Sequence, residues 1–210
     1  MKKPRFYTAK WRMLFPVTGS LAFLFLFLIA TVVYPGGSQA GLSAKGFSWM
    51  HNYWCNLLNE KALNGAANTA RPFAYLGMAV LLVAIMDFFL LAAKGLLESQ
   101  RAKNTLLFSG AVSLLLLPFL PTGFHDAVIN TSGFFGLVAM MVIFIGLYKK
   151  DWYILFAFGL FNLALIALNN YLYYSASFYF LPLVQKITIA SFLLWVCMIT
   201  VEICRRQAET

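Results

Sequence analysis

The stretch Leu21-Ala22-Phe23-Leu24-Phe25-Leu26-Phe27-Leu28 decides the fold class, because it carries no polar side chain on any face of a helix. It lies within a longer apolar run, residues 13–34. As one helix, that run is long enough to cross the hydrocarbon core of a bilayer, which is about 30 Å thick. A helix that is apolar all round belongs in lipid or in a large protein core. The stretch therefore predicts a membrane-spanning helix.

The composition extends this prediction to the whole chain. Of the 210 residues, 61% are hydrophobic, 17% are aromatic and only 11% are charged. Soluble domains are about half apolar and about a quarter charged, so a soluble fold could not bury this much apolar surface. We therefore predict a single membrane domain, residues 1–210, with lipid as its solvent.

Six apolar runs have the length of a spanning helix, and turn residues or charged residues separate them. The predicted fold is all-α: a polytopic bundle of six transmembrane helices with a short interfacial helix on its outer side. The predicted spans cover about residues 13–34, 72–95, 104–121, 125–148, 152–174 and 178–203.

The basic residues predict the orientation of these spans. Of the 16 Lys and Arg, 12 fall in the first segment, in residues 94–103, in the turn 149–151 and after the last span. Lys45, Lys61 and Arg71 fall on the opposite side. Because cytoplasmic segments carry an excess of basic residues, we predict a bacterial inner-membrane protein with both termini in the cytoplasm. This distribution also accounts for the net charge of +9 without a nucleic-acid partner. We therefore predict no binding of nucleic acid and expect membrane lipid as the partner.

The most polar and aromatic stretch lies between the first two spans, at residues 49–56. Phe47, Met50 and Trp54 recur at helical spacing, and polar residues occupy the positions between them. Such a segment is too short and too polar to span. We therefore predict an amphipathic helix over about residues 47–60, lying in the outer membrane interface.

Polar residues of several predicted helices fall at a similar depth, in the outer half of the membrane. Because such residues are costly in lipid, we predict that they face inward, line one outward-facing cavity and bind a ligand. Lys186 would then contact an anion, although a snorkelling or paired lysine fits the same position, and the other polar residues can equally form structural hydrogen bonds between helices. The candidate ligand-binding residues are Asn56, Asn130, Asn162, Asn170 and Lys186.

Metal and acid–base chemistry depends on two histidines. His51 and Cys55 are four residues apart, as ligands on one helical face are, and His125 and Asp126 open the fourth span. These four residues are the candidates for a divalent metal site, and no other cofactor is predicted. In a hydrolase, His51 or His125 would act as base and Asp126 would orient it. Alternatively, His51 contacts lipid headgroups and Asp126 stabilises a helix N-terminus.

The loop sequences resemble those of a known family. The signature Tyr34-Pro35-Gly36-Gly37-Ser38, the run Trp54-Cys55-Asn56-Leu57-Leu58 and the pair Gln185-Lys186 are similar to a family of small six-helix bacterial integral membrane proteins of unknown function. The resemblance implies a six-helix bundle and no particular activity, and it implies an acidic residue where this chain has Asn56. A more distant similarity to zinc-dependent intramembrane amide hydrolases fails, because those use three histidines and this chain has two.

Three functional hypotheses follow. The first is a protein that binds or moves a lipid or small amphiphile through the outer polar cavity. The second is an intramembrane, metal-dependent lipid hydrolase. The third is a structural or assembly subunit of a membrane complex. Polar groups within membranes are functional by default, which favours the first hypothesis.

Overall fold

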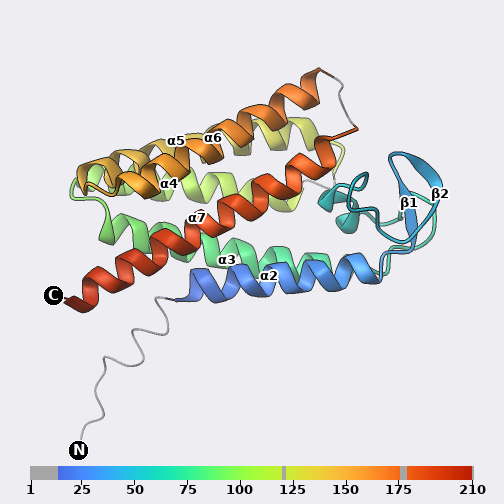
Figure 1. Cartoon of the computed structure of the whole chain (residues 1–210), viewed down its shortest axis with the longest axis horizontal. Helices are drawn as coiled ribbons and strands as arrows, with labels where there is room; N and C mark the ends of the chain where they lie inside the picture. Colours follow the sequence, from blue (N-terminus) through green and yellow to red (C-terminus); the bar gives the residue numbers. More distant parts are fainter. Residues whose placement is uncertain (1–13, 120–121, 176–178, 210) are drawn as a thin grey trace, which may run out of the picture. The chain divides into compact units, whose positions relative to one another are not determined.

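The computed structural model describes residues 14–119, 122–175 and 179–209, and it is built of long helices (Figure 1). The helices agree with the predicted spans to within a few residues at most ends, and the all-α prediction is confirmed. They are α2 (Phe15–Val32), α3 (Arg71–Gly95), α4 (Gln100–Leu116, followed by the 3₁₀ turn η2, Leu117–Phe119), α5 (His125–Lys149), α6 (Tyr153–Tyr174) and α7 (Leu181–Glu209).

All six are long and apolar enough to cross a membrane, with mean hydropathies between 1.4 and 2.5. The rest of the chain leaves most residues of each span unburied, and two spans are covered least. In the spans Gln100–Phe119 and Tyr153–Tyr174, only 17% of the most apolar 18-residue window is buried. Apolar helices with this much uncovered surface need lipid around them, which confirms the prediction of a multi-pass membrane protein.

The chain divides into two compact units, and the division cuts across helices. The helical unit comprises residues 14–20, 81–157 and 194–209, and the cap unit comprises residues 21–80 and 158–193. Helices α2, α3, α6 and α7 each contribute residues to both units, whereas α4 and α5 belong to the helical unit alone.

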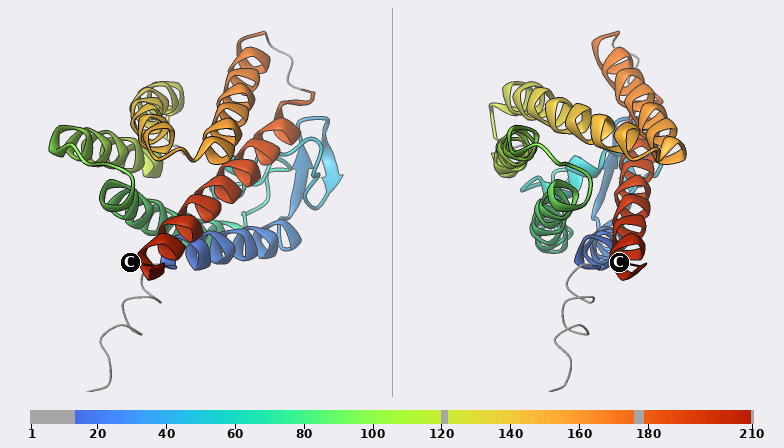
Figure 2. Two further views of the ribbon diagram at one scale, coloured as in Figure 1. Left: turned by 60° about the vertical axis from the view of Figure 1, so that its left-hand side comes forward. Right: turned by 90° about the vertical axis from the view of Figure 1, so that its left-hand side faces the viewer.

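Within the helical unit, α4 and α5 lie side by side (Figures 1 and 2). Two serines join them: the Ser113 hydroxyl donates to the Ser132 carbonyl, and the Ser132 hydroxyl donates to the Ser113 carbonyl, both at 2.9 Å. Lipid provides no hydrophobic drive for helices to associate, so reciprocal hydrogen bonds of this kind help to hold such a pair together.

Gly110 of α4 sits against the ring of Phe89, and a Cβ at this position would lie 2.4 Å from that ring. Phe89 is itself buried and has little room to move. We expect Gly110→Ala to lower the free energy of unfolding by about 1–3 kcal/mol, measured as a lower melting temperature in detergent. Gly133→Ala is the control, because a Cβ there meets no atom within 4 Å. Equal losses in the two variants would contradict this account of the helix contact.

The cap segment, residues 33–70, joins α2 to α3 and forms most of the non-helical part of the cap unit. It begins with a hairpin in which β1 (Gly36–Ser38) pairs antiparallel with β2 (Gly41–Lys45). Figure 2 shows the two strands beside each other. Gly37 makes this hairpin possible, because its φ is +82° and an added Cβ would lie 2.4 Å from the backbone nitrogen of Asn64.

The predicted amphipathic helix over residues 47–60 is wrong. Only Trp54–Leu58 is helical, as the single 3₁₀ turn η1, and turns precede it. Two asparagines explain the difference: Asn52 Oδ1 accepts from the Ser48 amide, and Asn56 Oδ1 accepts from the Tyr53 amide, each at 2.8 Å. Asparagine side chains that bond the nearby backbone compete with the helical hydrogen bonds.

Candidate functional site

The cap segment is fastened to the second turn of α7 by two adjacent side chains, Gln185 and Lys186. Gln185 accepts from the Trp54 amide at 3.2 Å and donates to Cys55 Sγ at 3.6 Å. The Lys186 ammonium donates to the Asn52 carbonyl and, at 2.8 Å, to the Pro182 carbonyl of its own helix. We call these residues, with His51, the cap junction: His51, Asn52, Trp54, Cys55, Gln185 and Lys186.

Lys186 is 5% exposed, so its charge is removed from solvent. Its ammonium lies 5.4 Å from the centroid of the Phe47 ring, where the negative face of the ring attracts a cation. The ion pairs of the described residues, Lys150–Glu98 and Glu202 with Arg205 and Arg206, do not include Lys186. Backbone carbonyls and an aromatic face therefore take the place of a carboxylate counter-ion.

Asparagine side chains also organise the interior of the cap segment. Asn68 Nδ2 lies within 3.2 Å of three carbonyl oxygens at the end of η1, those of Asn56, Leu57 and Asn59, and Asn68 Oδ1 accepts from the Ala70 amide. The last carbonyls of a helical turn have no partner within the turn, so this one side chain closes η1. Sequence reasoning missed Asn68, because nothing near it in the chain distinguishes it from an exposed loop asparagine.

Tyr34 provides a second link inside the cap segment, and the sequence analysis named it only as part of a signature. Its buried hydroxyl accepts from the Leu63 amide at 2.9 Å. Burial raises the pKa of the Tyr34 hydroxyl above its ordinary value, and the hydrogen bond from Leu63 opposes that shift. Tyr34 therefore stays protonated at neutral pH and holds the start of the cap segment to the turn that precedes α3.

His51 lies in a turn rather than on a helical face. Its Nδ1 is 3.2 Å from Ser48 Oγ, and its ring meets the Tyr179 ring edge-on, with centroids 5.0 Å apart. Its other nitrogen, Nε2, is buried and has no hydrogen-bond partner among the described residues. His51 therefore holds one polar atom to which no other described residue bonds.

Trp54 carries a second polar atom of this kind. Its indole ring is 7% exposed and packs edge-on against Phe23 and Phe27 of α2, with ring centroids 5.7 and 5.3 Å away. Among the described residues, no acceptor bonds its Nε1. Phe23 precedes the end of α2 by more than two turns, or roughly 14 Å at 1.5 Å per residue. The indole of Trp54 therefore extends along α2 to a point more than two turns from the end of that helix.

Polar residues also meet between α6 and α7. Asn169 Nδ2 donates to the Thr188 hydroxyl, which joins the two helices. Asn162 lies two turns before Asn169 on the same stripe of α6, and Ser191 lies one turn after Thr188 on the same stripe of α7. Asn162 is fully buried and donates to the Phe158 carbonyl, but Asn162 Oδ1 and Ser191 Oγ have no partner among the described residues.

The remaining predicted site residues are more dispersed. Asn170 is exposed on α6, and Asn56 is buried within the cap segment. Asp126 and Asn130 are exposed residues of α5 and belong to the helical unit. The side chain of His125 lies outside the described part of the chain. Within that part, no group of three or more His, Cys, Asp or Glu residues is placed to hold a metal ion.

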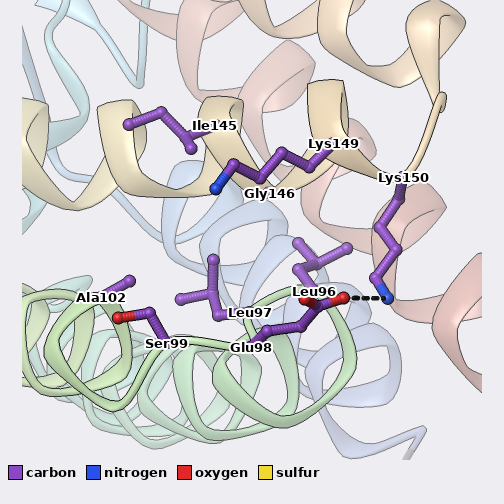
Figure 3. Close-up of a pocket in the computed structure, with 9 residues that line it drawn as sticks. All are labelled: Leu96, Leu97, Glu98, Ser99, Ala102, Ile145, Gly146, Lys149 and Lys150. Atoms are coloured by element: carbon purple, nitrogen blue, oxygen red, sulfur yellow. Dashed lines mark hydrogen bonds and ion pairs between the residues drawn. The ribbon is translucent and has the colours of Figure 1, made fainter.

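A small cavity of about 60 Å³ lies in the helical unit, where the turn between α3 and α4 meets the end of α5 (Figure 3). Figure 3 shows the Lys149 side chain lying along α5 beside this cavity, and Lys150 turned toward Glu98, with 3.5 Å between Nζ and Oε1. Both lysines are exposed. The sequence analysis used these lysines only to predict the orientation of the spans. No buried polar side chain lines the cavity, so nothing there defines a buried site.

Comparison of the chain with protein-family models, with curated proteins and with solved structures finds no match. The case for a function therefore depends on the geometry described above.

Proposed function

We propose that this protein binds or moves a lipid or small amphiphile, whose polar end meets unpartnered polar atoms in the cap unit. We further propose that the cap segment faces the outer side of a bacterial inner membrane, with both termini in the cytoplasm. The excess of basic residues on the opposite side of the predicted spans supports this orientation.

The observation that carries the proposal is the placement of four buried polar atoms. His51 Nε2, Trp54 Nε1, Asn162 Oδ1 and Ser191 Oγ are the buried side-chain atoms of the described residues that lack a hydrogen-bond partner, and all four belong to the cap unit. A buried polar atom without a partner costs about 1–3 kcal/mol. Elsewhere in the cap unit, the amides of Asn52, Gln185 and Asn68 are hydrogen-bonded. The exceptions therefore support a ligand that would supply the partners.

The exposed surface of the cap unit suits an amphiphile. Side chains of α2 such as Leu21, Phe25 and Leu28 are between 50% and 64% exposed, so apolar surface of the cap unit faces lipid. An acyl chain on apolar surface of this kind keeps its lipid contacts. A water-soluble ligand would gain nothing from this surface.

Asn162→Leu tests the proposal, because leucine has a similar volume and lacks the amide oxygen. We expect the protein purified in a mild detergent to retain an amphiphile in native mass spectrometry, and the variant to lose most of it. Asn170→Leu is the matched control: both asparagines lie on α6 and donate to the carbonyl four residues earlier, but Asn170 is exposed. Its retained mass should be unchanged.

Two results would count against the proposal. A bare protein mass under conditions that keep the fold intact would favour the structural or assembly subunit. Equal retention by the protein, Asn162→Leu and Asn170→Leu would show that any bound lipid is held elsewhere.

The second candidate function is an intramembrane lipid hydrolase, and one contact favours it. Ser48 Oγ and His51 Nδ1 are 3.2 Å apart, within the reach of a nucleophile and its base. Under this hypothesis, His51→Ala and Ser48→Ala would each abolish hydrolysis of a bound ester or amide, whereas binding alone requires no turnover. Retained lipid that is never cleaved would exclude it.

A further inference from the structure

We infer that the small cavity beside the turn between α3 and α4 binds the phosphate group of an anionic phospholipid, with an acyl chain of that lipid lying along α5. Every residue that lines the cavity lies within residues 81–157 and so belongs to the helical unit. The inference therefore does not depend on the amphiphile that we propose for the cap unit.

The cavity lies at the level where lipid headgroups are found. Helices α3 and α5 end beside it and α4 begins there, and spanning helices end at the membrane surface. The packing around it is close, because a Cβ added to Gly146 would lie 3.0 Å from side-chain atoms of both Leu96 and Leu97. The turn between α3 and α4 is therefore held directly against the last turn of α5.

Basic residues dominate the two segments that form this surface, residues 94–103 and 149–151. They contain five Lys or Arg against two acidic residues, Glu98 and Asp151. Asp151 accepts from the Tyr153 hydroxyl at 2.6 Å. The Glu98 side chain is 90% exposed, so its pair with Lys150 is weak. Each Lys or Arg near a membrane surface strengthens the binding of anionic lipid about fivefold. The five are Lys94, Arg101, Lys103, Lys149 and Lys150.

Lys149 and Ser99 bring two hydrogen-bond donors to the same cavity. The Lys149 side chain folds back along α5 toward Ile145 (Figure 3), so its ammonium lies beside the cavity and not beyond the end of the helix. The ion pairs of the described residues do not include Lys149. Ser99 precedes the first turn of α4, and its hydroxyl makes no capping hydrogen bond. Phosphate oxygens in the cavity would accept from both side chains.

The size and openness of the cavity suit a lipid phosphate. Its volume is about 60 Å³, several times the roughly 10–15 Å³ that one water molecule needs, so a phosphate group fits. A headgroup at the membrane surface stays partly hydrated, and exposed lysines are sufficient to bind it there. This ligand therefore requires no buried polar side chain.

Exposed apolar residues lead away from the cavity along α5. Ile145 lines the cavity, and Met141, Leu137 and Phe134 follow it at helical spacing on the same face. These four side chains are between 39% and 63% exposed. The stripe is about 16 Å long at 1.5 Å per residue, or roughly half of the hydrocarbon thickness of about 30 Å. An acyl chain that begins at the cavity can follow it through one leaflet, which favours a phospholipid over a free phosphate.

Lipid titration with native mass spectrometry tests the inference. The full-length protein in a mild detergent is titrated with dioleoyl phosphatidylglycerol, dioleoyl phosphatidylcholine or glycerol phosphate, and the apparent Kd of the first bound molecule is measured. We expect phosphatidylglycerol to bind at least about tenfold more tightly than phosphatidylcholine, because it alone of the two lipids carries a net negative charge. Glycerol phosphate lacks acyl chains and should show no saturable binding.

Three variants separate the site from the charge of the whole protein. Lys149→Gln should weaken phosphatidylglycerol binding about fivefold. Lys61→Gln removes the same charge from an exposed residue of the cap segment and should leave the Kd unchanged. Ala102→Leu keeps every charge but fills the cavity, and it should also weaken binding about fivefold or more.

Three results would overturn the inference. The first is an equal Kd for the two lipids. The second is an equal loss of phosphatidylglycerol binding in Lys149→Gln and Lys61→Gln, which would show attraction to the overall charge alone. The third is binding of glycerol phosphate as tight as that of phosphatidylglycerol, which would identify a site for a soluble phosphate.

Discussion

Asn68→Asp is expected to destabilise the cap segment more than any other single isosteric change. The substitution places an ionised oxygen where Nδ2 now lies within 3.2 Å of the carbonyl oxygens of Asn56, Leu57 and Asn59. Asn68 is 7% exposed, so water cannot screen the repulsion. An uncompensated buried charge costs about 3–5 kcal/mol. Thermal unfolding in detergent and limited proteolysis within residues 33–70 should both show the loss.

A pH series and a matched variant make this prediction specific. The carboxyl introduced by Asn68→Asp should have a pKa above its ordinary value, because its neutral form can still donate to one carbonyl. The loss of stability should therefore be complete above that pKa and shrink as the pH falls through it. Asn64→Asp is the control, since Asn64 is exposed and its side-chain oxygen, which aspartate keeps, accepts from Ala66. Similar losses in both variants would contradict the assigned role of Asn68.

Gly37→Ala should have the second-largest effect. Its φ of +82° is disfavoured for alanine, and the added Cβ would lie 2.4 Å from a backbone atom that has no rotamer to change. Strain and overpacking together should cost about 3 kcal/mol or more, seen as a lower melting temperature and a cap segment open to protease. Gly41→Ala, in β2, meets no atom within 4 Å and should be neutral. Wild-type stability in Gly37→Ala would refute the hairpin geometry.

The six spans were predictable because lipid imposes a simple rule on composition and length. A run such as residues 13–34 has no polar group that needs a partner outside its own helix, so its length alone identifies it. The turn after the first span was equally clear, since Pro35 cannot continue a helix and the glycines after it favour a turn. The structure places α2 at Phe15–Val32, within the predicted range.

The cap segment could not be predicted in the same way. The helical spacing of Phe47, Met50 and Trp54 indicated a helix. The spacing of apolar residues does not reveal which polar side chains will bond the backbone. Asn52 and Asn56 do so, and they turn the chain away from the helix. This competition between a helical hydrogen bond and an asparagine side chain is not visible in the spacing of the apolar residues.

For the candidate site, the sequence indicated the positions of interest better than their roles. Lys186 was identified as an unusual intramembrane charge, and the structure places it in the cap junction, bonded to the Asn52 carbonyl. Its partner is a backbone atom, and backbone atoms carry no signature in sequence. Ser191 was missed because a single serine in an apolar helix usually bonds its own backbone, and its lack of a partner is visible only in three dimensions.

The hydrogen bonds between the cap segment and α7 can form only late in biosynthesis. Asn52 and Trp54 are joined to residues 134 and 131 positions later in the chain. Residues 33–70 leave the ribosome early, yet their docking surface is made last. Until α7 has been inserted, the Asn52 carbonyl and the Trp54 amide lack the partners that Lys186 and Gln185 provide. Completion of the last helix is therefore a natural checkpoint for quality control, and chains that stop before Gln185 should be preferred substrates for membrane proteases.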